Sequence, residues 1–272
     1  MFNTAVSRPS NPTVSVIVPA KNEAANLREV LPRLPEVFEV ILVDGNSTDG
    51  TIEAAREVMP DIRVVRQTRR GKGNALTCGF LHARGDIIVM FDADGSADPD
   101  EIERFVQALV DGADFAKGSR YISGGGSTDI TWLRSTGNKA LNTMVNLLFG
   151  TKYTDLCYGY NAFWRDILPS LELPRPHIPA AEGDMLWGDG FEIETVLNVR
   201  VARNELAITE VPSVELLRIH GESNLSTFGD GFRVLRTILA ERARSKDADV
   251  HALPVPLPVA DDGSHSVVAQ AG

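Results

Sequence analysis

Two aspartates, Asp92 and Asp94, end an apolar run at residues 87–91 with one residue between them. Side chains alternate sides along an extended strand, so both carboxylates are expected to point the same way as the chain leaves the sheet. Two hard oxygen ligands, with the other positions left to water and diphosphate oxygens, suit Mg²⁺ or Mn²⁺ over a phosphorylated substrate. Helix capping explains the nearby Asp98, which precedes Pro99, but it leaves Asp92 and Asp94 unexplained.

The elements that must position these carboxylates are strands alternating with helical patterns. The strand-like runs of the first half are residues 14–18, 40–43, 63–65, 87–91 and 114–117. This alternation predicts a doubly wound α/β fold with a mostly parallel central sheet flanked by helices. Ligands of such sheets gather at the carboxyl ends of the strands, where polar residues stand at 19–23, 44–49, 92–94 and 118–120. We therefore expect one site along this edge.

Two glycine-containing turns at that edge each have two interpretations. In the turn at 44–51, Asp44 could accept hydrogen bonds from a ribose or a base, or the turn could only cap the next helix through Thr48 or Asp49. In the segment 69–74, RRGKGN, glycines and cations before a helix could cradle phosphate, but the spacing is not that of a P-loop. Neither turn identifies a function alone.

Composition limits the class of protein. The chain has 272 residues, of which 43% are hydrophobic and 24% charged, as expected for a soluble protein with one catalytic domain. A formal net charge of −10 argues against a general nucleic-acid binder. We find neither a signal peptide nor a membrane-spanning run. Cys78 and Cys157, in apolar or aromatic contexts, predict buried free thiols and fit a cytoplasmic protein.

The ends of the chain differ from its middle. The tail, residues 246–272, is rich in proline, aspartate and small residues without periodicity, so we expect it to be disordered, as we do residues 1–12. One domain is expected over residues 13–245. No internal repeat is found.

Four motifs of the first half occur in an order typical of one family. VSVIVPAKNEAANL, VDGNSTDGT, RRGKGNAL and FDADGSADPDEI closely resemble the nucleotide-sugar domain of family 2 inverting glycosyltransferases, which have the GT-A fold. The resemblance implies a nucleotide-sugar donor held within residues 13–120, and Mg²⁺ or Mn²⁺ bound by Asp92 and Asp94 with Ser96 beside them. The residues that it assigns to the nucleotide sugar are Pro19, Ala20, Asn22, Glu23, Asp44, Lys72, Asp92, Ala93, Asp94 and Arg218. Ser96 stands where the group commonly has glutamine.

The second half resembles dolichyl-phosphate mannose synthases and polyprenyl-phosphate glycosyltransferases. This resemblance lies in AKGSRYISGGG, Arg134, TDLCYGYNAFWRD, ITEVP and RIHGESNL. It implies that residues 121–245 bind the acceptor, that Arg120, Arg134 and Asn138 lie at the phosphate of a polyprenyl phosphate, and that Arg218 lies near the diphosphate. An arginine fork suits this role because it stays charged and pairs bidentately with phosphate.

The acceptor decides whether a base is needed. A lipid phosphate is already anionic and can attack the anomeric carbon directly, whereas a hydroxyl of a glycan, glycolipid or small molecule must lose its proton to a carboxylate. For a hydroxyl acceptor the candidates are Asp184 and Asp189, because Glu192 and Glu194 fall early in a helix, where carboxylates favour the helix dipole. A nucleotide-binding or nucleotidyl-transfer protein is a third interpretation, which the order of the motifs disfavours.

The last predicted helix, residues 228–244, is amphipathic. Phe228, Phe232, Leu235, Ile238 and Leu239 fall on one side at helical spacing, and Arg233, Arg236 and Arg244 fall on the other. Such a pattern is typical of a helix that packs on its own domain and equally of a basic helix on an anionic membrane. The second interpretation would bring a cytoplasmic enzyme into peripheral contact with the inner face of the cell membrane.

Overall fold

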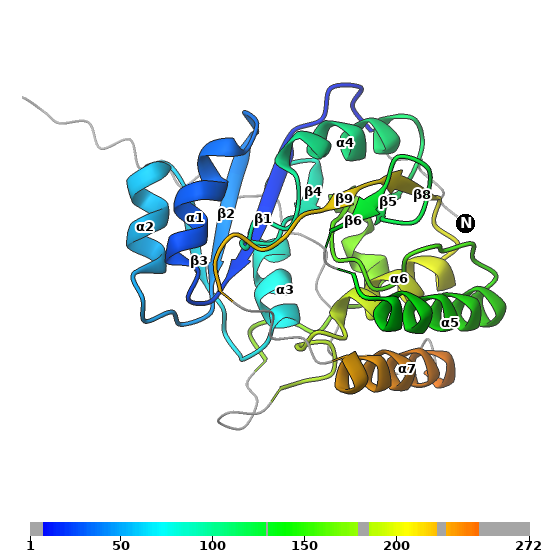
Figure 1. Cartoon of the computed structure of the whole chain (residues 1–272). Coiled ribbons are helices and arrows are strands. Elements are labelled where there is room, and N and C mark those ends of the chain that lie inside the picture. Colours follow the sequence, from blue (N-terminus) through cyan, green and yellow to red (C-terminus); the bar gives the residue numbers. More distant parts are fainter. Residues whose placement is uncertain (1–7, 129, 179–184, 222–226, 245–272) are drawn as a thin grey trace, which may run out of the picture.

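The computed structural model describes residues 8–128, 130–178, 185–221 and 227–244. Within them a seven-stranded sheet has the strand order β3-β2-β1-β4-β7-β5-β8 (Figure 1). Its strands are β1 Val14–Ala20, β2 Glu39–Asp44, β3 Arg63–Arg66, β4 Ile87–Met90, β5 Phe115–Ser119, β7 Asn161–Trp164 and β8 Ile208–Pro212. Two short strands, β6 Gly126–Ser127 and β9 Val214–Glu215, form a separate parallel pair.

All but one of the strands in the large sheet run in the same direction. The pairs β1–β2, β1–β4, β2–β3 and β5–β8 are parallel. β7 is antiparallel to both β4 and β5, between which it lies. The predicted doubly wound, mostly parallel sheet is confirmed, and the five strands predicted for the first half all form. β7 was not predicted.

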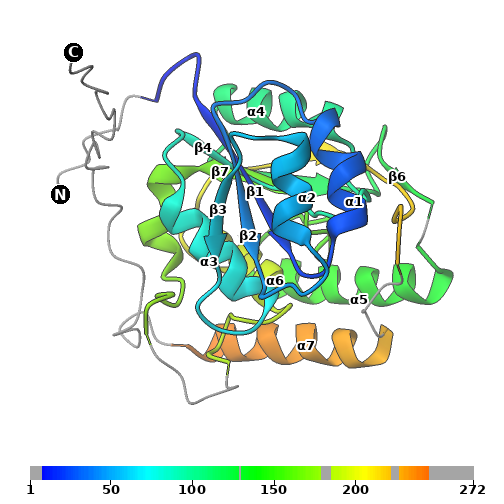
Figure 2. The same ribbon diagram turned by 90° about the vertical axis from the view of Figure 1, so that its left-hand side faces the viewer.

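Helices cover both faces of this sheet. They are α1 Ala24–Val30, α2 Thr51–Val58, α3 Lys72–His82, α4 Ile102–Val110, α5 Trp132–Phe149, α6 Ile193–Arg203 and α7 Thr227–Ala243. In Figure 2, α3 lies on one side of β1–β3, and α1 and α2 lie on the other. Strands covered on both faces need apolar residues at every position, which is why β4 reads IIVM and is buried throughout.

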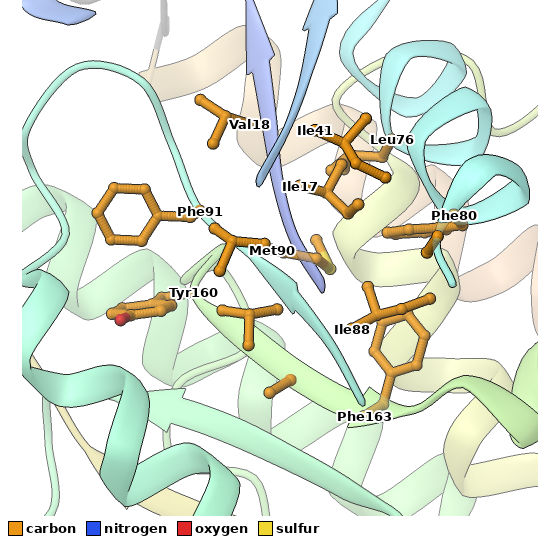
Figure 3. Close-up of a cluster of buried hydrophobic side chains, with 14 of the residues drawn as sticks. Ile17, Val18, Ile41, Leu76, Phe80, Ile88, Met90, Phe91, Tyr160 and Phe163 are labelled. Carbon is orange, nitrogen blue, oxygen red and sulfur yellow. The ribbon is translucent and has the colours of Figure 1, made fainter. Parts of the chain in front are cut away.

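Aromatic side chains from several elements fill the core around the antiparallel strand (Figure 3). The ring of Phe163 in β7 meets Phe80 of α3 edge-on at 5.3 Å and stacks on Phe115 of β5 at 5.8 Å. Tyr160 packs edge-on against Phe91 at 5.6 Å. Aromatic pairs in these geometries add about 0.5–1.5 kcal/mol each beyond the area that they bury. The site-bearing end of β4 is therefore fixed to the rest of the sheet.

A helix cap and the state of the two cysteines were also predicted from the sequence. Asp98 caps the 3₁₀ turn Pro99–Glu101 by accepting a hydrogen bond from the backbone N–H of Asp100, as predicted. Both cysteines are free, but only Cys78 is buried; the prediction that Cys157 is buried is wrong. No helix in these ranges is long and apolar enough to cross a membrane.

Candidate active site

Lys72, the first residue of α3, lies between two carboxylates that come from opposite parts of the chain. Its Nζ is 2.8 Å from Oδ1 of Asp92, which follows β4, and 2.7 Å from Oε1 of Glu194 in the first turn of α6. Burial alone would lower the pKa of Lys72, but the charges of Asp92 and Glu194 outweigh it and raise that pKa above its ordinary value. The lysine therefore remains a cation at any working pH.

Asp94, the second carboxylate of the pair, is held by a residue from the far end of the sequence. Nη2 of Arg218 is 2.9 Å from Oδ2 of Asp94, and Nη1 of the same arginine is 3.1 Å from Oε1 of Glu23. The hydroxyl of Ser96 donates to Oδ1 of Asp94 at 2.6 Å. Hydrogen bonds between Asn26 and the backbone of His220 fix the segment that carries Arg218. The predicted neighbourhood of Asp92, Asp94, Lys72 and Arg218 thus forms in the folded chain.

The charges of this cluster do not cancel. Four carboxylates, those of Glu23, Asp92, Asp94 and Glu194, face two cations, Lys72 and Arg218. Burial raises the pKa of Asp92, and the nearby charges of Asp94 and Glu194 raise it further against the opposing effect of Lys72. A surplus of two negative charges and a pair of hard oxygen donors fit a divalent cation. Among the described residues, no group of three or more histidine, cysteine, aspartate or glutamate side chains is arranged to hold a metal alone. Further ligands would have to come from substrate or water.

The residues assigned to the nucleotide meet at the carboxyl ends of β1 and β2. β1 ends with Pro19 and Ala20, and the carbonyl of Ala20 accepts from the N–H of Gly45 at 2.8 Å. Oδ1 of Asn22 accepts from the N–H of Thr48 at 2.9 Å, which joins the two turns. Asp44 ends β2 and is buried, Ala93 is buried between the two aspartates, and Asp49 accepts from the N–H of Thr51. The N-cap residue of α2 is Gly50, so Asp49 is not the cap itself, although it binds the first N–H of that helix. Asp44 stands at the edge of the sheet, its carboxylate 3.3 Å from the N–H of Ser47.

Gly71 and Gly73 of the RRGKGN segment allow the backbone at 188–189 to approach closely. A Cβ on Gly71 would lie 2.1 Å from the carbonyl oxygen of Asp189, and one on Gly73 would lie 1.9 Å from that of Gly188. The N–H of Asn74 donates to the carbonyl of Asp189 at 3.1 Å. The start of α3 is therefore packed directly on the chain at 188–189, which explains both glycines without a phosphate.

Asp189 has a structural environment that does not suit a base. Its oxygens are 2.7 Å from Nε and 2.8 Å from Nη2 of Arg69, and the exposed fractions of the two side chains are 0% and 4%. The N–H of Leu186 donates to the same carboxylate at 2.7 Å. A base must reach its substrate, and neither oxygen of Asp189 is accessible, so this geometry argues against the expected role of Asp189 as a base. Asp184, the other candidate, lies outside the described residues.

The two glutamates at the start of α6 differ in role. Glu192 is the N-cap residue of α6, but its Oε1 accepts from the N–H groups of Gly188 and Gly190 in the preceding turn, at 3.0 and 3.2 Å, and not from the helix. Glu194 instead reaches Lys72, a contact that the sequence analysis missed. The two residues stand 122 positions apart, and only the register of α6 against α3 brings them together.

Two of the three predicted acceptor residues converge on one carboxylate. Nε and Nη2 of Arg120 donate to Asp155 at 2.7 and 2.9 Å, and Nδ2 of Asn138 donates to the same side chain at 2.8 Å. Nη1 of Arg120 is 2.9 Å from Glu215. Arg134 lies one helical turn before Asn138 on α5 and is partly exposed. The sequence analysis did not identify Asp155 or Glu215, the carboxylates that hold Arg120.

A fully buried lysine lies beside this cluster. Nζ of Lys117 in β5 donates to the carbonyls of Gly118 at 3.0 Å and Tyr158 at 2.6 Å. Burial lowers its pKa to about 8, although the charges of Asp155 and Glu210 act in the opposite direction. Two backbone carbonyls therefore hold a cation that costs free energy to bury.

The sequence of this chain matches a known protein family and characterised relatives. The family described as "Glycosyl transferase family 2" matches residues 15–171. The chain is 33% identical over 234 residues to a polyprenol monophosphomannose synthase of Mycolicibacterium smegmatis, covering 82% of this chain and 84% of that protein. It is 32% identical over 225 residues to an undecaprenyl-phosphate mannosyltransferase of Micrococcus luteus, covering 78% and 87%.

A solved structure shows the same architecture. Glucosyl-3-phosphoglycerate synthase from Mycobacterium tuberculosis, in complex with Mn²⁺, uridine diphosphate and glucosyl-3-phosphoglycerate, superimposes with a TM-score of 0.64 at 25% identity, covering 88% of this chain and 82% of that one. The sheet described above is that of the GT-A fold. The chain is therefore a glycosyltransferase and belongs to glycosyl transferase family 2.

Proposed function

We propose that this glycosyltransferase is metal-dependent and inverting, and that it transfers a hexose from a nucleotide-sugar donor to a polyprenyl phosphate on the inner face of the cell membrane. The names of the two mannosyl-transferring relatives support this acceptor class. The observation that carries the proposal is that each described carboxylate of the segment 185–194 is already engaged. Asp189 pairs with Arg69, Glu192 accepts from backbone N–H groups, and Glu194 pairs with Lys72. An acceptor that needs no base fits this arrangement best.

The residues would divide the work as follows. Lys72 and Arg218 would bind the oxygens of the diphosphate, because they are the two cations of the cluster that contains Asp92 and Asp94. Asp92 and Asp94 would hold Mg²⁺ or Mn²⁺, which neutralises the charge that builds up on a diphosphate leaving group. Arg134 and Arg120 would orient the acceptor phosphate, Arg120 doing so by exchanging a carboxylate partner for it.

No proton is transferred in the chemical step. An oxygen of the acceptor phosphate forms a bond to the anomeric carbon from the side opposite the diphosphate, which inverts that carbon. The bond between the anomeric carbon and the diphosphate oxygen breaks, and its electron pair leaves with the nucleoside diphosphate.

The test compares two acceptors that differ only in the phosphate. Purified protein with Mn²⁺ or Mg²⁺ is incubated with a panel of nucleotide sugars and either a short-chain polyprenyl phosphate or the same polyprenol without phosphate, and release of nucleoside diphosphate and lipid product are followed. We expect product from the phosphate alone. Transfer to the polyprenol would favour a hydroxyl acceptor instead, and release of pyrophosphate would favour nucleotidyl transfer.

A phosphorylated small molecule is the second candidate acceptor. It is favoured by the similarity to the glucosyl-3-phosphoglycerate synthase structure. Phosphoglyceric acid therefore belongs in the acceptor panel, and transfer to it without transfer to polyprenyl phosphate would overturn the lipid assignment.

A further inference from the structure

Residues 216–221, which we call the strap, lie across the loop that carries the paired aspartates. The N–H of Leu216 donates to the carbonyl of Ser96 at 2.9 Å, and the N–H of Ile219 donates to the carbonyl of Asp94 at 3.0 Å. In Figure 1 this stretch follows β9 and runs towards α1. The strap is therefore bound to the backbone of the loop at two points.

The far end of the strap is fixed to α1. The N–H of His220 donates to Oδ1 of Asn26 at 2.9 Å, and Nδ2 of Asn26 donates to the carbonyl of His220 at 3.2 Å. A Cβ on Gly95 would lie 2.5 Å from Cδ1 of Ile219, so the isoleucine side chain fills the space over that glycine. The backbone is thus held on both sides of Arg218, and only the side chain of Arg218 can change partners without breaking these contacts.

Both oxygens of Asp94 bind groups of the chain itself. Oδ2 is 2.9 Å from Nη2 of Arg218, while Oδ1 accepts from the N–H of Ser96 at 3.0 Å and from its hydroxyl at 2.6 Å. The side chain of Asp92 is more open, with 37% exposed against 17% for that of Asp94. A divalent cation shared by the two aspartates would stand beside the guanidinium of Arg218, and two cations at one carboxylate repel each other. Arg218 and the metal therefore compete for Asp94.

The second partner of Arg218 belongs to the turn that is assigned to the nucleotide. Nη1 of Arg218 is 3.1 Å from Oε1 of Glu23, which follows β1, whereas Asp94 follows β4. These two strands are neighbours in the sheet, so the guanidinium bridges two adjacent strand ends. A diphosphate at these strand ends is anionic and can accept the paired N–H groups of a guanidinium. It offers Arg218 a partner in place of Asp94.

We propose that Arg218 is an exchangeable counter-ion of the metal site, which neutralises Asp94 until a divalent cation takes that carboxylate and then moves to the diphosphate of the donor. The inference rests on the metal-dependent transfer proposed above and adds how metal and donor depend on each other. Displacing Arg218 opposes binding of the cation alone, and a diphosphate that accepts the arginine offsets this cost. Metal and nucleoside diphosphate therefore bind cooperatively, and by linkage each raises the affinity for the other by the same factor.

The test first measures the affinity of the full chain for Mn²⁺ alone, from the electron paramagnetic resonance signal of free Mn²⁺. Arg218→Met keeps much of the side chain but removes its charge, so the competing cation is lost. We expect this variant to bind Mn²⁺ about tenfold more tightly than the wild type, within the usual range of about 5–150-fold for coupled sites. Arg218→Lys keeps the charge and should stay closer to the wild type than to Arg218→Met.

A matched control removes an arginine that pairs away from the site. Arg28 in α1 is 3.2 Å from Glu57, and Arg28→Met should bind Mn²⁺ as the wild type does. Equilibrium dialysis with GDP and with UDP, each with and without Mn²⁺, then measures the cooperativity. The factor by which Mn²⁺ raises nucleotide affinity should be at least about fivefold smaller in Arg218→Met than in the control.

The outcomes separate the exchange from the proposed function. Far-UV circular dichroism shows whether each variant is folded, and Arg218→Gln gives the same comparison should Arg218→Met not fold. A folded Arg218→Met protein that binds Mn²⁺ no more tightly than Arg28→Met would overturn the exchange, as would equal cooperativity in the two variants. Mn²⁺ binding that Asp94→Asn leaves unchanged would overturn the metal site itself, and with it the proposed metal dependence. No acceptor is present, so these results do not depend on polyprenyl phosphate.

Discussion

Replacing Asp189 with asparagine separates a structural role from a catalytic one. The change keeps the size of the side chain but removes its charge, and it leaves the guanidinium of Arg69, which is only 4% exposed, without a counter-charge. Breaking a buried ion pair costs about 3–5 kcal/mol. Asparagine can still accept one hydrogen bond from Arg69, so we expect the lower end, about 3 kcal/mol. Because folded domains have only about 5–15 kcal/mol of stability, this loss is large.

The assay measures stability and turnover on the same preparation. For a chain of this size, about 3 kcal/mol corresponds to a fall in Tm of roughly 6–12 °C, which circular dichroism will detect. Glycosyl transfer is then measured at 15 °C, where the variant remains folded. We expect the rate per folded molecule to stay within about threefold of the wild type, because the carboxylate does not reach substrate. A general base contributes about 10²–10⁴-fold.

Two further variants make the result decisive. Asp61→Asn, the same change at an exposed position, should leave both Tm and rate unchanged. Adding Arg69→Met to Asp189→Asn should cost less than the sum of the two single changes, because the pair is lost only once. An Asp189→Asn protein with normal Tm, or a folded one with a hundredfold lower rate, would refute the structural role.

Three other predictions concern the charges of the site and its surroundings. Asp94→Asn and chelation by EDTA should each abolish transfer and leave Tm nearly unchanged, because Asp94 belongs to a cluster with surplus negative charge; transfer in EDTA would contradict a metal-dependent reaction. Glu194→Gln removes one of the two anions that hold Lys72, so the KM for the donor should rise about tenfold with little change in kcat; unaltered kinetics would show that Lys72 does not depend on Glu194. Lys117 has a folded pKa of about 8, against 10.5 for the free side chain, so the native state releases its proton first and stability should rise with pH between these values, by up to about 3 kcal/mol. The difference in free energy of unfolding between the wild type and Lys117→Met, measured by urea titration from pH 7 to 10, should show this rise, and a flat difference would count against it.

The sequence predicted the parallel part of the sheet because short apolar runs, such as VILV in β2 and IIVM in β4, alternate along the chain with helical patterns. It did not predict β7, whose four residues, NAFW, include an asparagine and lie among irregular segments. Asp92 and Asp94 could be found because local spacing alone places them together. Glu194 could not, because its partner depends on how two helices pack. The sequence placed Phe232, Ile238 and Leu239 on one side of the last helix, but in α7 Ile238 is buried and the other two are exposed. Periodicity shows that a helix has two sides but not which residues its neighbours cover.

The position of β7 affects how far the two halves of the chain can act as separate units. β4 belongs to the first half, β5 ends it, and the strand that joins them comes from residues 161–164, some forty positions further along. The sheet cannot close until that segment has been synthesised, so a fragment that stops at residue 120 would expose the edges of β4 and β5 to intermolecular pairing. Exchange of the acceptor half by simple fusion at that point should therefore produce aggregates, whereas chimaeras joined after Trp164 would retain a continuous sheet through β5.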